Sequence, residues 1–266
     1  MEFPAYLPEA VRKYVTAMID GDILKPHGWA MSLSLSEKTV IELEQIMEHL
    51  SQHEEFENVD FLRKRYLEAV VNRDWFAREV DCLRGLIQDE RMQEVYALLT
   101  GEFLHDQQWI DYISSSWGAM LDFSKYRKRL KQAEEALEEI SVTAEKLANL
   151  ISQFSGIGVN GPDEFYSTPS VTALLQTMAS VARKFKPSED GCIGAAISSR
   201  KNNPKIEYLR AFGYLLTVYK FKLTKTMKQA MAITANVVIN DPDVDVTYED
   251  VQYSLSTMKI ERDRTF

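Results

Sequence analysis

The chain has 266 residues and a net charge of −9, with 45% hydrophobic and 27% charged residues. This length allows a buried core, and the composition is that of an ordinary globular protein. No apolar run reaches the ~18 residues of a membrane-spanning helix, and the acidic start at Met1–Glu2 lacks the features of a signal peptide. The two cysteines lie far apart, which favours a reducing compartment. We therefore expect a cytoplasmic protein with no membrane partner.

Charge is distributed unevenly along the chain. Residues 1–123 carry 11 basic and 23 acidic side chains, whereas residues 170–230 carry 11 basic and 3 acidic ones, a net charge of +8. Two explanations remain open for this asymmetry. The acidic and basic parts attract each other, or the basic part faces an anionic partner.

The first hundred residues predict amphipathic helices. Pro8 stands in the first turn of a helix that stops near Gly21, and Ser34 to Glu37 has the S-x-x-E form of a capping box. Apolar residues at helical spacing continue between Phe61 and Leu99. No β-branched run alternates as a strand does, so the sequence predicts an all-α fold.

The strongest pattern runs from residue 109 to residue 154. Apolar side chains recur there in alternating steps of three and four, which keeps them on one side of a helix. We expect one long, amphipathic, coiled-coil-like helix over about residues 107–155. It would pack in a helical bundle or form a homodimer. The side chains expected to mediate self-association are Tyr126, Leu130, Leu137, Ile140, Leu147 and Ile151.

A segment rich in glycine and proline, residues 158–169, follows this helix and predicts a linker. It would separate an acidic N-terminal helical region, residues 1–157, from a C-terminal helical domain, residues 170–266, which is basic to about residue 230. Asn203–Pro204 and Thr247 predict helix starts within the second domain, and residues 187–204 predict a loop.

Two groups of basic residues are candidates for phosphate binding, and a solvated helix face is the alternative for each. The first lies on the long helix and comprises Lys125, Arg127, Lys128, Arg129 and Lys131. The second lies in the C-terminal domain and comprises Arg183, Lys184, Lys186, Arg200, Lys201, Lys205, Lys220, Lys222, Lys225 and Lys228.

The first group raises a question about where its helix begins. A helix starting near Ser124 would place five bases at its positive end, which the helix macrodipole disfavours. A start near Asp106 would move them to mid-helix, and the continuous apolar spacing favours that start. Otherwise the bases are held for an anionic partner.

Motifs for catalysis, metals and cofactors fail on inspection. Residues 241–245 have the acidic spacing of a calcium loop, but the sixth position is Val246 and the twelfth is Gln252. His49 and His53 lie one helical turn apart without the other residues of a zinc site. Gly191 and Gly194 have G-x-x-G spacing without basic residues between them. We expect no metal and no cofactor.

Three classes of function remain. The leading hypothesis is a non-enzymatic helical protein that self-associates through the long helix and binds DNA or RNA through the basic C-terminal region. The second is an adaptor or inhibitor that binds another protein and has no nucleic-acid role. The third is an enzyme whose site is assembled from scattered carboxylates. A helix-turn-helix within the last three helices is a further alternative for DNA binding.

Overall fold

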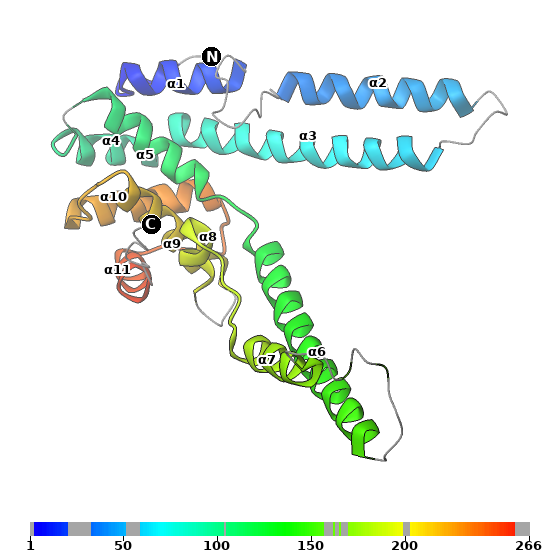
Figure 1. Ribbon diagram of the computed structural model, residues 1–266. Helices are drawn as coiled ribbons and strands as arrows, with labels where there is room; N and C mark the ends of the chain where they lie inside the picture. The colour runs from blue at the N-terminus through cyan, green and yellow to red at the C-terminus, as the bar shows by residue number, and fades with distance from the viewer. Residues whose placement is uncertain are drawn as a thin grey trace. The chain divides into compact units, whose positions relative to one another are not determined.

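The computed structural model describes residues 3–20, 33–51, 59–103, 105–156, 162, 165, 170–198 and 203–258. These residues form helices and no strand, which confirms the all-α prediction (Figure 1). The helices are α1 (Glu9–Asp20), α2 (Leu33–Ser51), α3 (Val59–Gln88), α4 (Arg91–Thr100), α5 (Asp106–Gly118), α6 (Phe123–Gly156), α7 (Val171–Lys184), α8 (Gly191–Ile197), α9 (Pro204–Val218), α10 (Lys225–Ile239) and α11 (Tyr248–Thr257).

The chain forms two compact units. The first combines residues 1–121 with residues 203–266, and the second comprises residues 122–202. The sequence predicted a different division, at residues 158–169. The difference arises because α7 packs along α6, while α9 and α10 pack with helices from the first half of the chain and α11 packs on α9 and α10.

The core of the first unit joins helices that are distant in sequence. α10 packs against α3, α4 and α5, and α9 packs against α5. Tyr112 of α5 donates to or accepts from Thr234 of α10 at 2.8 Å, and the Tyr208 hydroxyl of α9 donates to the Ser116 carbonyl at 3.1 Å. The largest fully buried side chains of this core are Leu86, Ile87, Met92, Leu99, Tyr112, Ile113, Leu209, Phe212, Leu216, Met227 and Met231.

The long helix is confirmed, but its predicted start near residue 107 is wrong. Residues 119–122 separate α5 from α6, although the apolar spacing runs straight across them. Ala119 and Phe123 are both buried, so the spacing persists through the turn. The Asp122 carboxylate accepts hydrogen bonds from the backbone N–H and the hydroxyl of Ser124, and so caps the start of α6.

The second unit is built on an antiparallel pair of helices, α6 and α7, which lie side by side (Figure 1). Ser141, Ala144, Ala148 and Ile151 form the buried line of α6, and Ala179 and Ala182 are buried on α7. Small side chains at these positions let the two backbones approach closely.

The predicted loop over residues 187–204 contains a short helix, α8, which packs against α6. Gly191 adopts φ +64°, and a Cβ on Gly194 would overlap the Glu189 carbonyl oxygen. Both glycines of the G-x-x-G pattern therefore allow a tight entry into α8. This explains their spacing without a ligand.

Side-chain caps confirm the two helix starts predicted at Asn203 and Thr247, and a third cap begins α10 at Thr224. The side chains of Asn203, Thr224 and Thr247 accept hydrogen bonds from the backbone N–H groups of Ile206, Met227 and Asp250. The Asp250 carboxylate in turn accepts a hydrogen bond from the Thr247 backbone N–H, which completes a capping box.

Candidate nucleic-acid interface

The α6 basic cluster comprises Lys125, Arg127, Lys128, Arg129 and Lys131, all within the first nine residues of a 34-residue helix. Lys125, Lys128, Arg129 and Lys131 are exposed, and Arg127 is half-buried. Three of these residues form long ion pairs: Lys131 Nζ lies 3.6 Å from Glu135, Lys125 Nζ lies 3.8 Å from Asp122, and the Arg129 guanidinium lies 3.9 Å from Glu189. Such exposed pairs contribute little stability, so these bases remain accessible to an anionic partner.

The observed start of α6 changes how this cluster must be interpreted. Mid-helix placement is ruled out because α6 begins at Phe123. Its first turn contains no acidic residue, and its last turn contains no basic one. Lys125, in that first turn, adds to the positive end of the macrodipole, which costs about 0.3–1 kcal/mol for a charge close to the terminus, and the other bases follow in the next turns. An anion bound here would meet both sources of positive potential.

The second group of basic residues is divided between the two units. Arg183 and Lys184 lie in the last turn of α7, in the second unit, and Lys186 follows that helix; all three are exposed. Arg183 pairs with Glu145 of α6 at 2.7 Å, so it helps to hold α7 on α6. Arg200 and Lys201 lie outside the described residues. The remaining lysines belong to the first unit.

The α9–α10 lysine cluster comprises Lys220, Lys222, Lys225 and Lys228, which surround the turn between these helices. Lys220, Lys222 and Lys225 are exposed, and Lys228 is half-buried. Lys220 has a positive φ of 64°, a conformation that non-glycine residues rarely adopt. Four lysines within nine residues make this turn strongly positive.

Two aromatic residues lie within the lysine cluster. Tyr219 is 47% exposed. Phe221 packs on Phe103, with 5.3 Å between ring centroids. Only Tyr219 of this pair therefore offers an exposed ring on which a base could stack.

Lys205 is tied into the fold of the first unit. Its Nζ donates to the Asp250 carboxylate at 2.9 Å and to the Asp245 carbonyl at 3.0 Å. Burial alone would raise the pKa of Asp250, but hydrogen bonds from Lys205 and the Thr247 backbone outweigh it and hold the pKa below its ordinary value. Lys205 thus fixes the start of α11 to the start of α9.

The residues expected to mediate self-association are not equally accessible. Ile151 is buried, Tyr126, Leu130 and Leu137 are half-buried, and Ile140 and Leu147 are exposed. The sequence analysis missed exposed apolar residues on α7, namely Leu174, Met178, Val181 and Phe185. Their spacing of four, three and four repeats the pattern of α6 and was the available signal.

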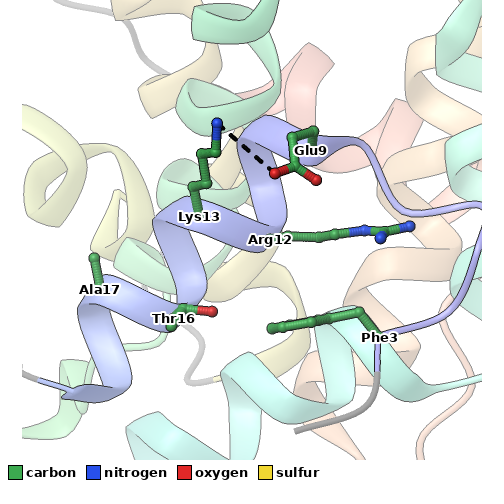
Figure 2. Close-up of a pocket in the computed structure, with 6 residues that line it drawn as sticks. All are labelled: Phe3, Glu9, Arg12, Lys13, Thr16 and Ala17. Atoms are coloured by element: carbon green, nitrogen blue, oxygen red, sulfur yellow. Dashed lines mark ion pairs between the residues drawn. The ribbon is translucent and has the colours of Figure 1, made fainter.

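A hollow of about 370 Å³ lies beside α1, where the described lining residues include Phe3, Arg12 and Lys13 (Figure 2). The Arg12 guanidinium donates to the backbone carbonyls of Leu7, Pro4 and Ala5 at 2.9–3.2 Å. Lys13 pairs with Glu9 at 3.7 Å. Because these charges already have partners, the hollow is a weak candidate for a ligand site.

Metal and thiol chemistry find little support in the part of the chain that the structure describes. No three His, Cys, Asp or Glu side chains gather there as a metal site requires. Both cysteines are free. Burial, aided by the nearby Glu79, raises the pKa of the Cys82 thiol to about 12, and burial raises the pKa of Cys192. Neither environment favours the nucleophilic thiolate at neutral pH.

Comparison of the chain with protein-family models, curated protein sequences and solved structures found no match. Among the described helices, none is both long and apolar enough to cross a membrane.

Proposed function

We propose that this chain is a non-enzymatic helical protein that binds DNA or RNA through its exposed basic clusters and self-associates through α6. The observation that carries the nucleic-acid proposal is the α6 basic cluster, which lies at the positive end of a long helix. Spaced, exposed bases suit the phosphates of a nucleic-acid backbone, because each phosphate that they neutralise releases a counterion.

The α9–α10 lysine cluster supports the same proposal from the first unit. It combines four lysines with the exposed ring of Tyr219, a combination suited to single-stranded nucleic acid. We place the protein in the cytoplasm, in keeping with its two free cysteines.

The test is a fluorescence-anisotropy titration of the full chain with labelled single- and double-stranded DNA and RNA at several salt concentrations. We expect an affinity that falls as a power of the salt concentration, since each phosphate contact contributes a slope of about −0.9 for duplex DNA and about −0.7 for single strands. No binding at low salt would refute the proposal.

Two variants separate the contributions of the clusters. K125Q/K128Q/R129Q/K131Q removes most of the α6 basic cluster, and K220Q/K222Q/K225Q/K228Q removes the α9–α10 lysine cluster. Each should weaken binding at least tenfold at low salt and make the salt slope shallower. The matched control is K13Q/K38Q/K64Q/R84Q, which removes the same charge from exposed positions on α1, α2 and α3. If the control weakens binding as much as the variants do, only net charge matters and the assignment of the clusters is wrong.

A protein-binding adaptor remains the second candidate, favoured by exposed apolar side chains on α6 and α7. It predicts no nucleic-acid binding at any salt concentration.

A further inference from the structure

The pair formed by α6 and α7 has one polar and one apolar side. Glu145 of α6 and Arg183 of α7 meet at 2.7 Å across the polar side. At 100° per residue, each of these residues lies about 70–80° to one side of its own helix's buried line, in the same rotational sense. The buried lines are Ser141/Ala144/Ala148/Ile151 on α6 and Ala179/Ala182 on α7.

The exposed apolar residues of both helices lie in the opposite rotational sense, except Val142, which lies on the side of Glu145. Ile140 and Leu147 lie about 60–80° from the buried line of α6, and Leu150 lies further round. Leu174, Met178, Val181 and Phe185 lie on average about 100° from the buried line of α7. Because Glu145 and Arg183 meet on one side of the pair, all these apolar residues share the other side. They form one surface, which we call the hairpin face.

The hairpin face is large for an uncovered surface. Its side chains are between 43% and 60% exposed, and they are Ile140, Leu147, Leu150, Leu174, Met178, Val181 and Phe185. Together they expose roughly 600 Å² of apolar surface, the size of the largest patch on a typical monomer. Two such faces in contact would bury about 1,200 Å², above the ~1,000 Å² that a specific interface needs.

The two helices also match each other in height, as pairing of identical faces requires. Because Glu145 is level with Arg183 and the helices are antiparallel, Leu147 is level with Val181 and Leu150 with Met178. A two-fold axis parallel to the helices would therefore set α6 of one copy on α7 of the other with these residues aligned. Every neighbouring pair of helices in the resulting four-helix bundle would be antiparallel.

We propose that the hairpin face binds the hairpin face of a second copy of this chain, forming a dimeric four-helix bundle. The inference rests on the self-association in the proposed function and does not depend on nucleic-acid binding. It moves the interface from Leu130, Leu137 and Ile151 to the exposed edge of α6 and to α7. An uncharged face of this kind suits another apolar surface and not a phosphate backbone.

Sedimentation velocity of the full chain tests the dimer directly. We expect a species of twice the 30.6 kDa chain mass that dissociates on dilution. M178E/V181E should be monomeric at concentrations at which the parent is dimeric, with unchanged helix content by circular dichroism. Both residues are exposed, so the substitutions spare the contacts between α6 and α7.

The matched control is L67E/V71E on α3, where two equally exposed apolar residues lie one turn apart. It introduces the same charges outside the hairpin face and should remain dimeric. A monomeric parent chain would overturn the proposal, as would a dimer that survives M178E/V181E. Loss of nucleic-acid binding alone would refute the proposed ligand and leave the dimer standing.

Disulfide trapping tests which helices meet. A chain carrying L147C, mixed with a chain carrying V181C, should give a covalent dimer on oxidation. Both chains would also carry C192S, whereas Cys82 can stay because it is buried. If two L147C chains crosslink with each other, and no L147C chain crosslinks with a V181C chain, the pairing of α6 with α7 is wrong.

Discussion

At the residue scale, the buried hydrogen bond between Tyr112 and Thr234 gives a sharp test of the first unit. The two hydroxyls lie 2.8 Å apart, in helices separated by more than a hundred residues. Thr234→Val keeps the side-chain shape but leaves the Tyr112 hydroxyl without this partner, which should cost about 1–3 kcal/mol of stability. Urea unfolding measures that loss.

A double-mutant cycle provides the control for this hydrogen bond. Adding Tyr112→Phe to Thr234→Val removes the orphaned hydroxyl and should recover most of the stability. If the two substitutions are strictly additive, the hydroxyls do not interact in solution, and the docking of α10 on α5 must be reconsidered.

Asp250 makes stability depend on pH in a predictable direction. Its pKa is lowered in the folded chain, so its ionised form stabilises the fold above the ordinary Asp pKa of about 3.9. That contribution is lost as the pH falls through the lower, folded-state pKa. Asp250→Asn retains an oxygen for the Thr247 cap but loses the charge that faces Lys205, at a cost of about 1 kcal/mol at neutral pH.

Urea unfolding of the parent and the Asp250→Asn variant between neutral pH and pH 3 measures this effect. The difference in stability should shrink as the pH falls below about 4. A difference that is independent of pH would mean that the charge of Asp250 contributes nothing. The Lys205→Gln variant should show a similar loss of stability and almost unchanged nucleic-acid binding.

Residue-scale features were the most predictable from sequence. Asn203 and Thr247 cap helices as expected, because a cap depends on a few consecutive residues. The ion pair between Lys205 and Asp250 was not predictable, since 45 residues separate the partners. The sequence therefore grouped Lys205 with the exposed bases. In the folded chain, its ion pair with Asp250 gives it a structural role.

At the scale of elements, the α6 basic cluster should trade helix stability against binding. K125Q/K128Q removes two charges near the positive end of α6, where the macrodipole disfavours them. We expect a gain of about 0.5 kcal/mol in stability at low salt that disappears at high salt, together with weaker nucleic-acid binding.

Thermal unfolding at two salt concentrations checks this trade. The same substitutions at Lys184, the last residue of α7, and at Lys186, two residues beyond it, remove favourable charges from a negative helix end and should lower stability slightly. Equal changes in stability at both sites would show that the positions of the bases relative to the helix ends do not affect stability.

The spacing of apolar residues predicted helices well and their breaks poorly. An apolar spacing of three and four residues shows which side chains are buried, and Ala119 and Phe123 are both buried. The break between α5 and α6 left no interruption in that register. The signals that were present are Gly118 at the end of α5 and the Asp122 cap two residues before Ser124. Local capping chemistry should therefore be weighed before long-range periodicity.

At the scale of the whole molecule, the division of the chain could not be read from its linkers. The segment at residues 158–169 has the composition of a domain boundary, yet the helices on either side of it, α6 and α7, pack together. Glycine and proline mark where a helix ends and give no information about which helices associate afterwards. The return of residues 203–258 to the first unit depends on long-range contacts such as that between Tyr112 and Thr234.

This organisation predicts how the chain tolerates being cut. A fragment of residues 170–266, the domain expected from sequence, would expose the faces of α9 and α10 that pack on α4 and α5, including Phe212, whose ring packs on Tyr112 of α5. We expect it to be largely unfolded by circular dichroism, because its helices lose most of their apolar partners. A chain in which a Gly/Ser linker replaces residues 122–202 keeps every element of the first unit. It should unfold cooperatively in urea, remain monomeric, and bind nucleic acid only through the α9–α10 lysine cluster. If instead the 170–266 fragment folds and the deletion variant does not, the Gly/Pro segment is the true boundary, and the packing of α10 on α4 and α5 does not hold the first unit together.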